Sequence, residues 1–132
     1  MKYTVNYFIY NGKPEHVLFD FVPPNETLTC FLVDDFSAFK TMYLDAIDKV
    51  LRGESGKEEL TGNSSYIEFG PVNTFLENLF PSEENVPETC TLDTKELRQV
   101  MDEWLEAERK RKEAAEKPQD GAPAAEGKGE TR

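Results

Sequence analysis

The 132-residue sequence contains only two cysteines and one histidine, and this scarcity limits the chemistry that the chain can carry. Cys30 and Cys90 lie sixty residues apart, so they form no CxxC pair and no other spacing typical of a metal site. His16 follows Glu15 and has no second histidine to join it, so we expect a surface or hydrogen-bonded histidine rather than a ligand. The sequence therefore predicts no metal site, and two reduced thiols in a cytoplasmic protein.

The sequence also lacks a long hydrophobic run. No segment approaches the roughly 20 apolar residues that a membrane-spanning helix needs. The first residues, MKYTVN, contain no uninterrupted apolar signal region. We therefore expect neither a membrane partner nor export.

Catalytic motifs are missing as well. The sequence contains no Gly-rich phosphate loop, no HExxH and no GxSxG. A cysteine–histidine nucleophile would need one of the two cysteines to meet His16, whereas both cysteines are predicted at core strand positions. General acid–base chemistry needs two carboxylates in a sheltered cleft with separated pKa values, and no pattern here indicates one. We therefore predict no catalytic residue, no cofactor site and no enzymatic activity.

Positive charge is scarce in the part of the chain that should fold. The formal net charge is −11 and the sequence pI is about 4.5, which argues against nucleic acid as a partner because phosphates would be repelled. Residues 1–105 hold nineteen acidic and eight basic residues, whereas residues 106–132 hold seven of each. The excess negative charge serves either general solubility or the recognition of a basic protein.

Two stretches contain acidic residues and no lysine or arginine. Residues 14–39 hold five acidic residues, and residues 58–93 hold eight. Such a surface suits fast electrostatic capture of a basic protein, and nearby aromatics such as Tyr66 and Phe80 could anchor the contact. We predict partner-binding residues in the second stretch, namely Glu58, Glu59, Tyr66, Glu68, Glu77, Glu83, Glu84 and Glu88.

The N-terminal half shows signals for a hairpin followed by a helix. Tyr3–Tyr10 and His16–Val22 are predicted strands joined at Asn11–Gly12, because both residues tolerate positive φ. Thr27–Leu32 is expected to be a short extended segment. Apolar residues then recur at intervals of three and four, which predicts a helix over Asp35–Arg52 capped by Asp34 or Asp35 and ended by Gly53.

The second half shows short strands and then the strongest helix signal in the chain. Glu59–Thr61 and Tyr66–Phe69 are predicted strands, and for Thr74–Leu79 a strand is favoured over a single helical turn. A further strand over residues 89–92 leads to Asp93, a good N-cap, with Glu96 three residues later to complete a capping box. The following helix has one apolar face, formed by Leu97, Val100, Met101, Trp104 and Leu105.

These elements predict the α+β class: one domain with a mostly antiparallel sheet of about five strands and two packed helices, in the order ββαβββα. The domain is expected to cover residues 1–110. Residues 111–132 are expected to be a charged helix end and a disordered tail, because Lys117–Arg132 is rich in Pro, Gly, Ala and charge. Ala107–Glu116 is charged all round and is predicted to have nothing to bury.

The predicted domain is small and acidic, and it ends in Asn78–Leu79–Phe80, an acidic loop, and then Cys90–Leu97 followed by a helix that bears Trp104. With this ending, residues 1–110 show a resemblance to the immunity proteins of bacterial polymorphic-toxin and contact-dependent growth inhibition systems. The resemblance implies a non-enzymatic inhibitor that binds one cognate toxin domain, often a nuclease, and blocks its active site or an exosite. Two alternatives remain, an adaptor or regulatory subunit of another complex and a small enzyme with an unrecognised carboxylate site.

Overall fold

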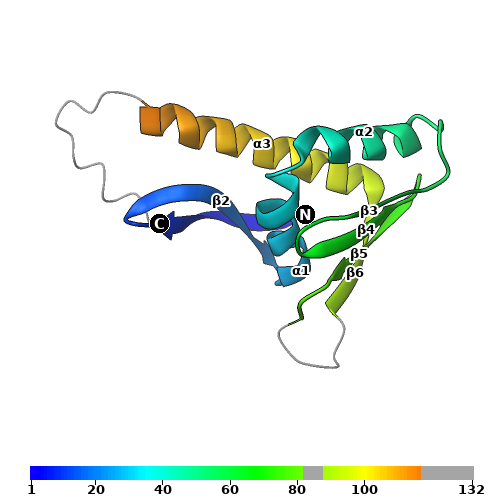
Figure 1. The fold of residues 1–132 in the computed structure, drawn as a ribbon, viewed down its shortest axis with the longest axis horizontal. Coiled ribbons are helices and arrows are strands. Elements are labelled where there is room, and N and C mark those ends of the chain that lie inside the picture. Colours follow the sequence, from blue (N-terminus) through cyan, green and yellow to red (C-terminus); the bar gives the residue numbers. More distant parts are fainter. Residues whose placement is uncertain (82–87, 117–132) are drawn as a thin grey trace.

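The N-terminal residues form the predicted hairpin in a computed structural model that describes residues 1–81 and 88–116 (Figure 1). β1 (Lys2–Tyr10) pairs antiparallel with β2 (Lys13–Val22). Asn11 and Gly12 have φ values of 53° and 76°, as a tight hairpin turn requires. Alternate side chains of β2 are buried, namely Val17, Phe19 and Phe21. The prediction of the hairpin is confirmed.

The segment after the hairpin is helical, so the prediction of an extended Thr27–Leu32 is wrong. α1 (Glu26–Cys30) begins after Asn25, whose Oδ1 accepts a hydrogen bond from the Leu28 N–H at 3.0 Å. Cys30 is therefore in a helix and not in a strand. The alternation of threonine with apolar residues imitates a strand, but the N-cap and the apolar residues buried at helical spacing, Leu28, Phe31 and Leu32, favour the helix.

The predicted helix Asp35–Arg52 is divided into two. The π-helical segment η1 (Phe31–Phe36) continues directly from α1, and α2 (Lys40–Leu51) begins four residues later. Neither aspartate is an N-cap, because both lie within η1 and the N-cap position of α2 is Phe39. The predicted end is confirmed, since Gly53 has a φ of 78° and its N–H donates to the Val50 carbonyl.

A separate four-stranded antiparallel sheet follows, in the order β3 (Glu58–Thr61), β4 (Ser65–Phe69), β5 (Asn73–Asn78) and β6 (Glu88–Asp93). The strand interpretation of the segment after residue 73 is thus confirmed. The described residues hold six strands in two sheets rather than about five in one. The predicted order lacks one strand and the helical segments that precede α2.

The last helix, α3 (Thr94–Glu116), begins as predicted, because Asp93 Oδ2 accepts a hydrogen bond from the Glu96 N–H at 3.0 Å. Four of the five predicted apolar residues are buried, and Leu105 is half-buried. Figure 1 shows α1, α2 and α3 on the same side of β3–β6, with the hairpin beside the C-terminal half of α3. The prediction of the α+β class is confirmed.

The C-terminal half of α3 differs from the prediction that it has nothing to bury. Glu108 is only 4% exposed, and its two carboxylate oxygens accept hydrogen bonds from the Val17 N–H and from Arg111. Arg111 also donates to the Pro14 carbonyl oxygen at 3.1 Å. The charged end of the helix is therefore attached to the hairpin. The predicted disordered tail, Lys117–Arg132, lies outside the described residues.

Candidate functional site

The side of β3–β6 that faces away from the helices carries acidic and aromatic side chains, and we call it the outer face. The strand alternation explains its composition. β4 buries Ser65, Ile67 and Phe69 on the helix side, so its intervening residues lie on the other side. The pairing of the four strands then assigns these residues to the outer face: Glu59, Thr61, Tyr66, Glu68, Phe75, Glu77, Thr89 and Thr91.

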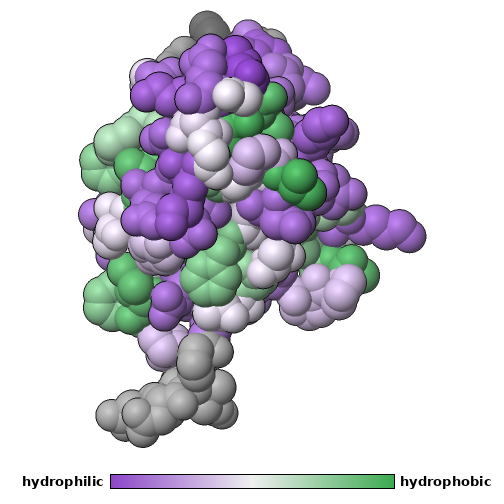
Figure 2. All heavy atoms as spheres, turned by 90° about the vertical axis from the view of Figure 1, so that its right-hand side faces the viewer, coloured by the Kyte–Doolittle hydropathy of each residue, from purple (hydrophilic) through white to green (hydrophobic). Residues whose placement is uncertain are grey.

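The strand register places the outer-face residues in two rows across the sheet. In one row Glu59 lies opposite Glu68, which lies opposite Phe75. In the other row Tyr66 lies opposite Glu77. Acidic and aromatic side chains are therefore neighbours both along the strands and across them. Figure 2 looks at the side of the molecule where this sheet lies and shows hydrophilic and hydrophobic residues interspersed, without a large apolar patch.

Tyr66 lies at the centre of this negative field. Its hydroxyl donates a hydrogen bond to Glu68 Oε1 at 3.0 Å, and its ring lies 6.3 Å from that of Phe75. Burial, this hydrogen bond and the charges of Glu59 and Glu68 together raise the pKa of Tyr66 to about 12. One cation reaches the edge of the outer face, since Lys57 Nζ lies 3.1 Å from Glu59 Oε2.

The structure brings together half of the residues predicted from the sequence. Glu59, Tyr66, Glu68 and Glu77 share the outer face. Glu58 and Glu88 are assigned to the helix side by their pairing with Phe69 and Asn78, and the Asn78 side-chain amide donates to Glu88 Oε1 at 2.9 Å. Glu83 and Glu84 lie outside the described residues.

One outer-face aromatic was missed by the sequence reasoning. Phe75 is half-buried and lies between Glu68 and Thr91 in the strand register. Phe75 and Leu76 are adjacent apolar residues, so no alternation in the sequence shows which of them is buried, and only the strand register assigns Phe75 to the outer face. The exposed Phe80, 71% accessible, follows the same strand.

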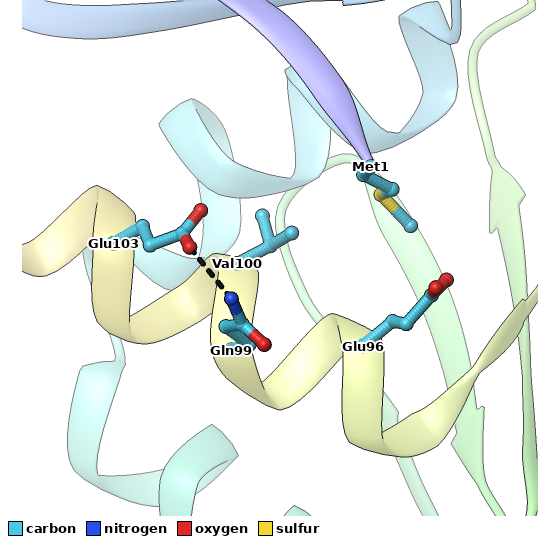
Figure 3. Close-up of a pocket in the computed structure, with 5 residues that line it drawn as sticks. All are labelled: Met1, Glu96, Gln99, Val100 and Glu103. Atoms are coloured by element: carbon cyan, nitrogen blue, oxygen red, sulfur yellow. Dashed lines mark hydrogen bonds between the residues drawn. The ribbon is translucent and has the colours of Figure 1, made fainter.

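A second feature is a shallow hollow of about 90 Å³ between α3 and the start of β1, lined by Met1, Glu96, Gln99, Val100 and Glu103 (Figure 3). Hydrogen bonds from the Tyr3 hydroxyl at 2.6 Å and from the Gln99 amide at 2.9 Å hold the pKa of Glu103 below its usual range. A lowered pKa keeps this carboxylate ionised, which does not suit a general acid.

A buried carboxylate, that of Asp35, connects η1 to the turn between β3 and β4. Asp35 Oδ1 accepts hydrogen bonds from the backbone N–H groups of Asn63 and Ser64 at 2.6 and 3.1 Å. Burial raises the pKa of Asp35, and these hydrogen bonds oppose the rise. A Cβ atom at Gly62 would lie 2.5 Å from Asp35 Cγ, so the turn needs glycine there. This fully buried group positions a turn.

Within residues 1–81 and 88–116, His, Cys, Asp and Glu side chains form no group of three or more that could hold a metal ion. In the same ranges, no helix has the length and apolar character needed to cross a membrane. Comparison with protein-family models, with curated proteins and with solved structures finds no match to this chain.

Proposed function

We propose that this chain is a non-enzymatic, cytoplasmic binding protein that holds a basic protein on the outer face of β3–β6. The observation that carries the proposal is the composition of this face. It presents Glu59, Glu68 and Glu77 next to Tyr66 and Phe75, on a sheet whose other side is covered by helices. Carboxylates attract a basic partner from a distance, and aromatic side chains supply contact area once it has arrived.

The physical properties of the face support binding rather than proton transfer. The carboxylates of Glu59 and Glu68 lie beside a tyrosine whose pKa of about 12 keeps it protonated at neutral pH. A protonated phenol can donate a hydrogen bond, and a rigid sheet holds it in place at little entropic cost. A basic side chain that docks here would meet carboxylate acceptors and an aromatic ring within one small area.

The most specific form of the proposal is an immunity protein that neutralises a cognate basic toxin domain, for instance a nuclease. The acidic chain supports this form, because nucleases carry basic surfaces that bind phosphates. The resemblance of the strand–helix ending to immunity proteins supports it as well. An adaptor that binds a different basic protein would use the same surface.

The first test is to read the genes next to the one that encodes this chain and to express the product of an adjacent toxin-domain gene in an inactivated form. We expect tight binding by calorimetry that weakens as salt rises, because surface charge attraction is screened. We also expect co-expression of this chain to rescue the growth of cells that carry the active toxin. A gene neighbourhood without any toxin or secretion gene contradicts the immunity assignment.

A matched pair of variants tests whether the outer face is the surface used. Glu68→Gln with Glu77→Gln removes two charges from the face, and Glu15→Gln with Asp45→Asn removes two exposed charges elsewhere. We expect the first pair to weaken binding at least about tenfold, equivalent to about 1.4 kcal/mol, and the control pair to have a much smaller effect. Equal effects of the two pairs would mean that only net charge matters and would remove the outer face as the site.

A further inference from the structure

The two long edges of the hairpin differ in how their backbone groups are bonded. On the β2 edge, Val17 donates its N–H to Glu108 Oε2 at 2.6 Å, and its carbonyl accepts from Trp104 Nε1 at 3.0 Å. The Phe19 carbonyl accepts from the Thr29 hydroxyl at 2.7 Å. Side chains of α3 and α1 therefore cover this edge and leave no room for another strand.

Among residues 1–81 and 88–116, no side chain covers the β1 edge in this way. Tyr7 and Val5 lie opposite Val17 and Phe19, whose backbone groups point away from β1, so their own backbone groups point away from β2. By the same alternation the backbone N–H and C=O groups of Tyr3 also point away from β2. No residue in the described ranges forms a hydrogen bond with these three backbone units. An edge of this kind is a template for a further strand.

The side chains along β1 lack the charges that protect most strand edges. Residues 1–14 contain no acidic residue, although the whole chain has a net charge of −11. Val5 is 44% exposed and Phe8 is 47% exposed, and Lys2 is the only charged residue of the strand. A second acidic copy can therefore approach β1 without meeting a negative charge on that strand.

We propose that two copies of this chain associate through their β1 edges in antiparallel orientation, with the two-fold axis at Val5. This register places Val5 opposite Val5 of the second copy and Tyr3 opposite Tyr7. Thr4 then lies opposite Asn6, and Lys2 lies opposite Phe8. The two hairpins become one continuous four-stranded sheet, and the outward backbone groups of Tyr3, Val5 and Tyr7 are all paired.

The self-complementarity of this register favours a second copy over a foreign strand. A C2 interface uses the same patch on both subunits, so a suitable strand must match itself when reversed. On one side of the sheet Val5 lies opposite Val5, with the aromatic residues Tyr3 and Tyr7 opposite each other. On the other side the polar residue Thr4 lies opposite the polar residue Asn6. No like charges lie opposite each other. The contact is small, so we expect a reversible dimer. The outer face of β3–β6 remains free.

Sedimentation equilibrium over about 1 μM to 1 mM protein, the range in which small interfaces associate, tests the proposal. We expect the wild-type mass to rise toward twice the monomer mass. Val5→Lys places like charges opposite each other at the axis and should weaken association at least about tenfold. Val72→Lys is the matched control, because Val72 is 67% exposed in the turn before β5 and should leave association unchanged.

Cross-linking supplies a second, independent measurement. In the proposed register the two Val5 Cα atoms would be about 5.5 Å apart, which a disulfide can span. Val5→Cys should therefore form a covalent dimer under mild oxidation much faster than Val72→Cys. Circular dichroism of each variant confirms that it is folded. A wild-type protein that stays monomeric, a Val5→Lys variant that associates like wild type, or equal cross-linking at the two positions would each overturn the proposal.

The salt dependence of association distinguishes the proposed dimer from the binding of a basic partner at the outer face. Two acidic copies repel each other over distance, so the dimer should persist or strengthen as salt rises. Capture of a basic partner by the outer face should weaken under the same conditions. A dimer that dissociates with increasing salt would contradict the β1 contact and would leave the outer-face proposal untouched.

Discussion

The two sheets of this protein are stabilised in different ways. The four-stranded sheet β3–β6 has one side covered by helices, and it buries Ile67, Phe69 and Leu76 there. The β1–β2 hairpin has only two strands, and an isolated two-stranded hairpin is marginally stable at best in water. Its attachment also uses α3, because Trp104 and Arg111 donate hydrogen bonds to backbone carbonyls of β2 and Glu108 accepts one from the Val17 N–H.

This difference indicates where each sheet is vulnerable and what each leaves available. The hairpin adds buried polar contacts with α3 to the apolar burial of Val17, Phe19 and Phe21, so single changes on α3 should weaken its attachment. The larger sheet depends on apolar burial on one side, so its outer face can be changed at little cost to stability. The two edges of the hairpin differ as well: side chains of α1 and α3 cover the edge of β2, whereas the edge of β1 is open in the described residues.

The largest expected effect comes from breaking the α3–hairpin contact. Glu108→Ala leaves the Val17 N–H and the Arg111 guanidinium without their partner in a buried site, and removing one member of a buried ion pair costs about 3–5 kcal/mol. Urea unfolding measures the loss. Glu106→Ala is the control, since Glu106 also pairs with an arginine but is half-exposed, and such pairs contribute less than about 1 kcal/mol. Similar losses for both variants would show that the contact is not buried.

A smaller effect is expected at the connection between η1 and the larger sheet. Asp35→Ala leaves the N–H groups of Asn63 and Ser64 unpaired, and each unsatisfied buried donor costs about 1–3 kcal/mol. Asp35→Asn retains an oxygen at the position that accepts both bonds and should cost less. Unfolding in urea distinguishes them. An alanine variant as stable as the asparagine variant would contradict the role of these hydrogen bonds.

The pH dependence of stability adds a check on the same group. Because burial raises the pKa of Asp35 above its usual 3.8, the folded state binds this proton more tightly than the unfolded state. The stability that protonation contributes is therefore complete below about pH 3.8 and is lost as pH rises through the raised pKa. Wild type should gain stability relative to Asp35→Asn as pH falls from 7 toward 4. Parallel pH profiles of the two proteins would contradict the raised pKa.

The smallest effect on stability is expected at the outer face. Glu68→Gln lies on the solvent side of the sheet and should change the unfolding free energy by no more than about 0.5 kcal/mol. It should nevertheless lower the pKa of Tyr66 from about 12 toward its usual 10, because the negative charge on the group that accepts the Tyr66 hydrogen bond is removed. NMR titration of the tyrosine rings measures this, with Tyr66→Phe to assign the signal. An unchanged Tyr66 titration would remove the electrostatic coupling across this face.

Local signals predicted several elements correctly because their causes lie within a few residues. The Asn11–Gly12 turn needs only residues that tolerate positive φ, and the start of α3 needs only Asp93 and the N–H three residues later. The error at Thr27–Leu32 has a local cause too. Threonine alternates with apolar residues there, which is typical of a strand. The Asn25 N-cap and the helical spacing of the buried residues favour a helix instead.

The candidate site could be predicted only in composition. Residues 58–93 contain eight acidic residues and no lysine or arginine, and this composition alone indicated an acidic surface. The strand register decided which residues share a face, because a shift of one residue moves every side chain to the opposite side. It places Glu59 on the outer face and its neighbour Glu58 on the other, and it adds Phe75 to the surface.

By itself the sequence determined the hairpin turn, the Asp93 N-cap of α3, the end of α2 at Gly53, the apolar stripe of α3 and the excess of negative charge, because each depends on neighbouring residues or on composition. Only the tertiary structure decided the burial of the charged residues. Glu108 meets a backbone N–H that lies 91 residues earlier in the chain, and Asp35 meets one 28 residues later. Such partners are brought together by the packing of whole elements, and no local pattern in the sequence predicts which residues will meet.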